Sequence, residues 1–256
     1  MEGSIGFFDS GVGGISVLNE ARGLLPHEDF LYYGDNLNAP YGEKPLEQIR
    51  ALTQDGVDFL LKKGIKALVI ACNTATSAHA ETLRRELSIP IVAMEPALKP
   101  AHSLRKQGRV LVLATRATLA LPKFRQLMAL YGEGALPLVG EGLVELVESG
   151  CFSAKEADEA IRSLLAPFLR ESIDAIVLGC THYVFLRPRF EALFPGAAIV
   201  DGNAGTARRL QSVLTQNNAL RPGGRGKTKL FSSGGEPFLR LMHSLLEEKA
   251  NEVQHG

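Results

Sequence analysis

Two stretches of the sequence run from an apolar segment into a cysteine and then into polar side chains. The first covers residues 65–74 and contains Cys72, and the second covers residues 173–182 and contains Cys180. Each begins with isoleucine, a charged residue and alanine, and continues through branched aliphatic side chains. Thiols can act as nucleophiles or as proton donors and acceptors. Because the two stretches lie in different halves of a 256-residue chain, they suggest two copies of one half-site.

The residues after each cysteine are polar where a buried strand would stay apolar. Asn73 and Thr74 follow the first cysteine, and Thr181 and His182 follow the second. We expect a helix to begin at each place, where free backbone N–H groups and the positive end of the dipole lower a thiol pKa or hold a carboxylate. A cysteine at a strand end is more often a packing residue, so these polar flanks are what favours chemistry. His182 is a candidate proton partner for Cys180.

Cysteines near a histidine can also indicate a zinc site. The chain contains no Cys-x-x-Cys pair and no second cluster of cysteine and histidine, so neither a metal site nor a dithiol redox pair is expected. A Cys–His nucleophile at Cys180 remains possible, but it leaves Cys72 unexplained. Cys151 has no polar flank of this kind and is interpreted as a bystander.

A glycine-rich loop at residues 9–14 reads Asp-Ser-Gly-Val-Gly-Gly after a short apolar strand. It does not match the dinucleotide-binding fingerprint, whose third glycine would fall at Ser16. Asp9 is a candidate carboxylate for orienting or deprotonating a thiol, although a helix N-cap explains it equally well. Residues 226–228 resemble the end of a phosphate-binding P-loop, but position 221 is arginine and an apolar run follows, so this match is rejected.

Two thiols on opposite faces of one carbon can move a proton from one side to the other. One thiolate removes the proton and the opposite thiol returns one, which inverts the stereocentre. Negative charge then builds on the substrate carboxylate and needs hydrogen-bond donors around it. No phosphate, nicotinamide or metal is needed. The candidate donors are backbone N–H groups at the two helix starts together with Ser10, Asn73, Thr74, Thr118 and Thr181.

Short apolar runs alternate with amphipathic stretches, a pattern typical of parallel sheets with helices on both faces. Strands are expected at residues 4–8, 30–33, 89–94, 109–114, 197–200 and 229–232 and in the two cysteine stretches. Helices are expected at residues 15–25, 45–63, 77–87, 121–131, 142–149, 154–171, 187–193, 203–215 and 236–250.

The order strand, loop, helix, strand, cysteine occurs in both halves of the chain. It predicts an α/β fold of two similar parallel-sheet lobes that pack face to face. Ligands of such sheets bind beyond the carboxyl ends of the strands. We therefore expect the active site in the cleft between the lobes, with the two thiols on opposite sides of one ligand.

Composition narrows the class of protein. Apolar residues make up 45% of the chain and charged residues 22%, with a formal net charge of zero, so we expect a globular protein that binds neither nucleic acid nor membrane. No apolar run reaches the length of a membrane span. The N-terminal residues do not resemble a signal peptide, and three cysteines are too few for a disulfide framework. A reducing cytoplasm is the expected location.

Four motifs together resemble those of the glutamate racemases, members of the cofactor-independent aspartate/glutamate racemases. The resemblance covers essentially the whole chain and implies interconversion of L- and D-glutamate, supplying D-glutamate for bacterial peptidoglycan. It also implies a homodimer that uses no cofactor. The motifs are Asp9-Ser10-Gly11-Val12-Gly13-Gly14, Tyr33-Gly34-Asp35 with Pro40-Tyr41-Gly42, Ala71-Cys72-Asn73-Thr74-Ala75 and Gly179-Cys180-Thr181-His182.

The same resemblance implies roles for individual residues. Cys72 would take the proton from D-glutamate with help from Asp9, and Cys180 would take it from L-glutamate with help from His182. Glu148 matches a further acidic residue near the second thiol, within a looser pattern. The residues expected to hold the substrate are Asp9, Ser10, Pro40, Tyr41, Gly42, Asn73, Thr74, Thr118, Thr181 and His182.

The resemblance also divides the chain into lobes. Residues 1–96 and 205–256 would form the lobe with Cys72, and residues 97–204 the lobe with Cys180. Because the chain begins almost at its first strand, without an N-terminal extension, we expect no activation by a peptidoglycan precursor. The alternatives are an aspartate racemase, a hydrolase or transferase that uses Cys180 alone, and a module that binds an amino acid without turning it over.

Overall fold

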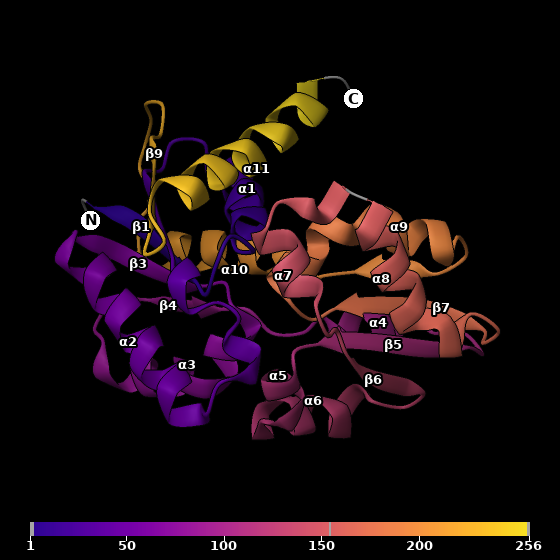
Figure 1. The fold of residues 1–256 in the computed structure, drawn as a ribbon. Helices are drawn as coiled ribbons and strands as arrows, with labels where there is room; N and C mark the ends of the chain where they lie inside the picture. Colours follow the sequence, from indigo (N-terminus) through magenta and orange to yellow (C-terminus); the bar gives the residue numbers. More distant parts are fainter. Residues whose placement is uncertain (1–2, 154, 255–256) are drawn as a thin grey trace.

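The computed structural model describes residues 3–153 and 155–254, which contain two all-parallel β-sheets with helices around them (Figure 1). The first sheet has the strand order β4-β3-β1-β2-β9 and the second the order β6-β5-β7-β8. The expected α/β fold with two parallel-sheet lobes is therefore confirmed. Figure 1 shows the C-terminal elements β9 and α11 lying with N-terminal elements, and β9 pairs with β2.

The strands of both sheets are short and apolar, as expected where helices cover both faces. In the first sheet they are β1 (Ser4–Asp9), β2 (Phe30–Gly34), β3 (Ile65–Ile70), β4 (Ile91–Ala93) and β9 (Thr228–Ser232). In the second they are β5 (Arg109–Ala114), β6 (Ala135–Val139), β7 (Ile173–Leu178) and β8 (Ala198–Val200).

The helices follow the amphipathic stretches. The α-helices are α1 (Ile15–Leu24), α2 (Leu46–Lys62), α3 (Asn73–Glu86), α4 (Leu98–Leu104), α5 (Arg116–Ala120), α6 (Pro122–Tyr131), α7 (Leu143–Glu148), α8 (Lys155–Leu165), α9 (Arg187–Leu193), α10 (Asn203–Gln216) and α11 (Glu236–Gln254). The 3-10 turns are η1 (Asn36–Asn38), η2 (Tyr41–Glu43), η3 (Cys151–Ser153), η4 (Ala166–Phe168) and η5 (Thr181–Leu186).

Neighbouring side chains of β1 enter different cores because side chains alternate across a strand. Phe7 is buried with apolar residues of α1, and Phe8 is buried with apolar residues of α2. The cluster that contains Phe7 also contains Leu111 and Leu113 of β5. One continuous apolar core therefore joins the two sheets.

Five expectations for the elements were wrong or incomplete, and one of them is α5, which the sequence analysis missed. The sequence analysis missed β6, whose Pro137 is tolerated because this strand lies at the edge of its sheet. It also missed α4, in which Pro100 occupies the first turn, where no N–H partner is lost. The helix expected at residues 154–171 ends at Leu165 and is followed by η4, while residue 154 lies outside the described residues. Cys180 is followed by the 3-10 turn η5 rather than by an α-helix.

None of the helices in the described ranges is long and apolar enough to cross a membrane. Residues 1 and 2, on which the expectation about a signal peptide partly depends, lie outside those ranges.

Candidate active site

Cys72 lies between the carboxyl end of β3 and the first residue of α3. Its side chain caps the helix, because the Ala75 N–H donates to Sγ at 3.4 Å. The Ser10 hydroxyl lies 3.4 Å from the same sulfur. The side chain is buried, with 5% of the residue exposed. The first thiol therefore contacts one hydroxyl and one helix N-terminus inside the protein.

Cys180 occupies the corresponding place after β7, but its surroundings differ. Its Sγ lies 3.7 Å from Nδ1 of His182, and Nε2 of that imidazole lies 2.5 Å from Oε1 of Glu148. Glu148 comes from the last residue of α7. The second thiol is thus the first member of a Cys–His–Glu chain.

The loop after β1 reaches across to the second sheet. Oδ1 of Asp9 accepts from the Gly11 N–H at 3.0 Å, and Oδ2 accepts from the Thr181 hydroxyl at 3.1 Å. A Cβ added at Gly11 would collide with the Glu148 carboxylate, and one added at Gly13 would lie 2.5 Å from His182 Nδ1. Only glycine permits this approach, which explains the glycines of the loop without any phosphate ligand.

Three threonine hydroxyls form a second bridge between the lobes. Thr74 at the start of α3 lies 2.9 Å from Thr115 and 3.1 Å from Thr118, and the latter two are 2.9 Å apart. All three residues are buried. Beside them, the side-chain oxygen of Asn73 is buried and has no hydrogen-bond partner among the described residues, while its Nδ2 points to Met94 Sδ at 3.4 Å.

The loop that carries Pro40, Tyr41 and Gly42 lies over the same region. The Tyr41 hydroxyl donates to the buried Asp35 carboxylate at 2.7 Å, which pins the loop to the end of β2. A Cβ added at Gly42 would lie 2.6 Å from Cβ of Thr115, so this loop also touches the second lobe closely. The expected substrate contacts of this loop therefore lie where the two lobes meet.

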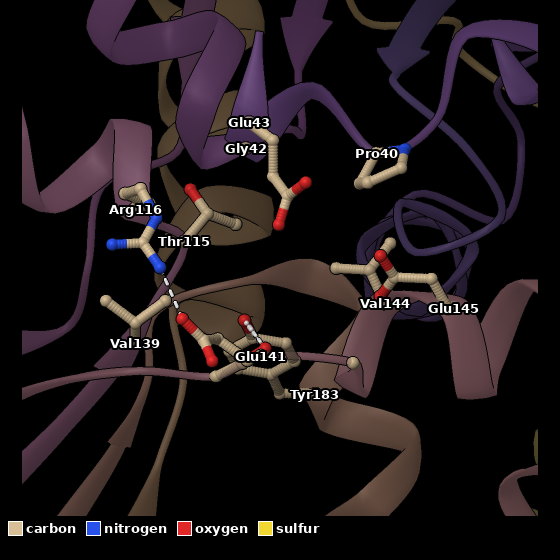
Figure 2. Close-up of a pocket in the computed structure, with 12 residues that line it drawn as sticks. Pro40, Gly42, Glu43, Thr115, Arg116, Val139, Glu141, Val144, Glu145 and Tyr183 are labelled. Carbon is tan, nitrogen blue, oxygen red and sulfur yellow. Dashed lines mark hydrogen bonds and ion pairs between the residues drawn. The ribbon is translucent and has the colours of Figure 1, made fainter.

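A narrow pocket opens between this loop and the second lobe (Figure 2). Glu43 points into it from the first lobe, and on the opposite wall Arg116 pairs with Glu141. The pocket holds about 20 Å³, room for about one water molecule. The pocket as it stands is too small for an amino acid.

The first thiol is held in its neutral form. Burial raises the pKa of Cys72 to about 12, and the charge of Asp9 and the nearby Cys180 add to the rise. The hydrogen bonds from Ser10 and Ala75 act in the opposite direction. Burial also raises the pKa of Asp9 to about 6, against the opposing charge of His182.

In the second half-site, the contacts around His182 and Glu148 favour the charged forms of both side chains. Burial alone would lower the pKa of His182, but its contacts with Cys180 and Glu148 outweigh burial and raise that pKa well above its usual value. Burial would raise the pKa of Glu148, and the hydrogen bonds from His182, Val12 and Asn36 overcome it and lower that pKa. An imidazolium between a carboxylate and a thiol stabilises a thiolate. The two half-sites therefore differ in charge: the first holds a neutral thiol, and the second holds a thiol beside a charged histidine–glutamate pair.

Comparison with known proteins identifies the family to which the chain belongs. Residues 16–210 match the family model described as Asp/Glu/Hydantoin racemase. A glutamate racemase of Clostridium botulinum (strain Okra / Type B1) is 51% identical over 233 residues, 90% of this chain and 91% of that protein. The chain belongs to the Asp/Glu racemase family.

Solved structures of this racemase family have the same fold. Glutamate racemase from Thermus thermophilus, in complex with beta-chloro-D-alanine, has a TM-score of 0.78 at 37% identity and covers 96% of this chain and 92% of its own. Escherichia coli glutamate racemase, in complex with L-glutamate and the activator UDP-MurNAc-ala, has a TM-score of 0.84 at 31% identity and covers 96% of this chain and 95% of its own.

A metal site gains no support from the geometry, whereas the Cys–His–Glu chain also fits a Cys–His nucleophile at Cys180. Within residues 3–153 and 155–254, no group of three or more histidine, cysteine or acidic side chains could hold a metal ion. Cys151 is exposed, in η3, and within the described part of the chain its sulfur hydrogen-bonds to the backbone oxygen of Ser149. It belongs to neither thiol environment.

The structure brings the sequence-predicted residues of both lobes to one place. Asp9 contacts Thr181, and Thr74 contacts Thr118, across the two sheets. The sequence analysis missed Asn36, whose Nδ2 donates to Glu148 Oε2 at 2.8 Å. No local pattern points to Asn36, because its partner is far away in the sequence. The long polar loop after β2 was the available signal.

Proposed function

We propose that this protein is a glutamate racemase that uses two thiols and supplies D-glutamate for peptidoglycan. The observation that carries the proposal is the pair of buried thiols at equivalent strand ends, Cys72 beside the Ser10 hydroxyl and Cys180 beside the His182 imidazole. The relatives that are 51% identical and bear the name glutamate racemase support glutamate as the substrate.

In the proposed reaction, Cys72 acts on D-glutamate and Cys180 acts on L-glutamate. When D-glutamate reacts, its Cα–H bond breaks and the proton moves to the Cys72 thiolate. The electron pair passes into the α-carboxylate. The thiol of Cys180 then gives its proton to the opposite face of the carbon and becomes a thiolate. The reverse direction uses the same steps in the opposite order, so each thiol acts as both acid and base.

The partners of the two thiols would prepare them in different ways. Asp9 would accept the proton of the Cys72 thiol, whose raised pKa makes ionisation costly in the free protein. A bound substrate brings an ammonium group, and its positive charge favours the thiolate. His182, held by Glu148, would stabilise the Cys180 thiolate as an imidazolium.

The polar groups around the thiols would hold the substrate. The unpartnered Asn73 oxygen is an acceptor that the substrate ammonium would satisfy. The threonine hydroxyls, which bond to one another in the free protein, would turn to donate to a carboxylate as negative charge builds on it. The complete proposed set of binding residues is Asp9, Ser10, Pro40, Tyr41, Gly42, Asn73, Thr74, Thr118, Thr181 and His182.

The wider setting follows the same proposal. The lobes would comprise residues 1–96 with 205–256 and residues 97–204, and they would separate to admit glutamate. The enzyme would work without a cofactor as a homodimer in the cytoplasm. The pocket beside Pro40 and Glu43, which is too small for an amino acid, supports such a separation.

A hydrogen-exchange assay tests the proposal. The protein is incubated in deuterated water with each enantiomer of glutamate and of aspartate, and α-deuterium and optical rotation are followed. We expect deuterium incorporation and loss of rotation with both glutamate enantiomers. Turnover of aspartate alone would make the protein an aspartate racemase. An absence of exchange with all four amino acids would contradict racemisation and favour a binding module.

A further inference from the structure

The Glu148 carboxylate is the point at which the second half-site is attached to the first lobe. Its Oε1 accepts from His182 Nε2 at 2.5 Å and from the Val12 N–H at 2.7 Å. Its Oε2 accepts from Nδ2 of Asn36 at 2.8 Å. The donor to Oε2 thus comes from η1, in the loop between β2 and α2 of the first lobe.

The Asn36 amide is held in one orientation from its other end. Its Oδ1 accepts from the Ser232 hydroxyl at 2.7 Å, and the oxygen of that hydroxyl accepts from the Gly234 N–H at 3.0 Å. A flipped amide would place Oδ1 against the Glu148 carboxylate, acceptor against acceptor. Asn36 itself is 5% exposed, so water does not replace either contact freely.

We propose that Asn36, oriented by Ser232, is a positioning residue for the Cys180 half-site alone. By donating to Oε2 it keeps the Glu148 carboxylate ionised and turned toward His182, so that the imidazolium stays beside Cys180 Sγ. The inference rests on the proposed racemase function, and it concerns the proton transfer at Cys180, one of the two proton-transfer steps of that reaction.

The charges around Glu148 explain why a neutral donor suits this place. His182 of η5 faces it with positive charge, whereas Asp9 of β1 is a second carboxylate close enough to interact with it. Tyr32 of β2, also within reach of the Glu148 charge, donates its hydroxyl to Gly11 O at 2.7 Å. An amide stabilises the carboxylate without competing with His182 for the role of cation. Removing it would leave a largely buried anionic oxygen without its donor.

The first test replaces the amide by an apolar group of similar size. For the Asn36→Leu variant we expect kcat/KM to fall by about tenfold to a hundredfold. It must fall equally for the two enantiomers, since they have the same free energy in solution. The informative readout is therefore the primary deuterium isotope effect measured separately from each enantiomer.

A higher barrier for the Cys180 step alone makes the two isotope effects diverge. With α-deuterated L-glutamate the isotope effect on kcat/KM rises, because removal of the proton by Cys180 becomes more rate-limiting. With α-deuterated D-glutamate it falls, and recovered D-glutamate gains more solvent hydrogen. Isotope effects that change in the same way from the two enantiomers, or an unchanged kcat/KM, would overturn the proposal. Because wild-type racemisation is measured alongside, this failure is distinct from failure of the proposed function.

Two serines at the end of β9 provide a matched pair. The Ser232→Ala variant removes the hydroxyl that orients the Asn36 amide, and we expect a divergence of the same sign but smaller size. The Ser233→Ala variant removes a neighbouring hydroxyl that accepts from the Leu37 N–H, and we expect wild-type isotope effects. Equal behaviour of the two serine variants would contradict the role of Ser232.

The Asn36→Asp variant guards against loss of folding as the explanation. Two carboxylates at this distance would share a proton, and the protonated form can donate to Glu148 as the amide does. We expect its activity relative to wild type to recover as the pH falls. Relative activity that does not depend on pH, in a variant whose thermal unfolding matches wild type, would contradict the proposal.

Discussion

The two thiols occupy equivalent places on their sheets but depend on different partners. Phe8 of β1 pairs with Ile70 of β3, and Leu113 of β5 pairs with Leu178 of β7. Each cysteine follows the second residue of its pair by two positions. Both pairings also contain a register shift at their first residues. The scaffold of one half-site therefore repeats in the other.

The side chains on this repeated scaffold have diverged. Asp9 follows Phe8 in the first sheet, whereas Ala114 follows Leu113 at the same place in the second. The second thiol therefore has no carboxylate at the corresponding position of β5, and Glu148 from α7 contacts its neighbour His182 instead. In each lobe, a residue after the cysteine contacts the opposite lobe: Thr181 bonds to Asp9, and Thr74 lies against Thr115 and Thr118.

In the proposed mechanism, this difference lets two thiols that are not identical act on the two enantiomers from opposite sides. One is a neutral thiol that feels the charge of a carboxylate of raised pKa, and the other lies against a histidine that is stabilised as a cation. Equality of kcat/KM in the two directions is imposed by thermodynamics, not by symmetry of the site. The half-sites are therefore free to differ in the height of their individual barriers.

The largest expected effect tests whether both thiols are needed. Both Cys72→Ser and Cys180→Ser should lower kcat for racemisation by at least about a thousandfold, since a hydroxyl is a far weaker acid than a thiol. Loss of optical rotation of each glutamate enantiomer provides the measurement. A Cys72→Ser enzyme that kept most of its turnover would instead indicate chemistry at Cys180 alone.

These serine variants also sharpen the comparison through one-sided chemistry. A glutamate analogue with chloride on its β carbon loses hydrogen chloride once the α-proton is removed, with no need for a second thiol. We expect the Cys72→Ser variant to eliminate chloride from the L form and the Cys180→Ser variant from the D form. Release of chloride from the same enantiomer by both variants would contradict the assignment of faces.

The next largest effect distinguishes the roles of His182 and Asp9, the proposed proton partners of the two thiols. We expect His182→Asn to lower kcat/KM by about a hundredfold, because the Cys180 thiolate loses its cation. The isotope effect should rise for α-deuterated L-glutamate and fall for the D enantiomer, as for the Asn36→Leu variant. Asp9→Asn should produce the opposite divergence. The same direction of change in both variants would show that the half-sites are not separately controlled.

The features of the two half-sites that depend on local sequence pattern were predicted from the sequence. The two apolar runs that end in cysteine predicted parallel strands, and the alternation of elements predicted two α/β lobes, both confirmed. Edge and first-turn prolines concealed β6 and α4, because proline usually interrupts regular structure. The contacts within the candidate site were harder to predict from the sequence. The bond from Asn36 to Glu148 exists only because two lobes meet, and no spacing in the chain encodes it.

A smaller effect concerns pH. Burial raises the pKa of Asp9 to about 6, and in the proposed mechanism Asp9 has to be ionised to accept the Cys72 proton. We therefore expect kcat/KM to fall by about tenfold per pH unit below pH 6. The pH–rate profile of free enzyme provides the measurement, with Asp9→Asn as control. A limb near pH 6 that persists in this variant would assign the titration to another group.

The smallest effect concerns the hydroxyl beside the first thiol. Ser10 lies 3.4 Å from Cys72 Sγ, and its hydrogen bond opposes the rise in the thiol pKa that burial causes. Ser10→Ala should lower kcat/KM by about two- to tenfold, the range for loss of one uncharged hydrogen bond. Ser10→Thr keeps the hydroxyl and should lose less. Because only the Cys72 step is weakened, the isotope effect should rise for D-glutamate and fall for L-glutamate. A rise for L-glutamate would place the Ser10 hydroxyl in control of the other half-site.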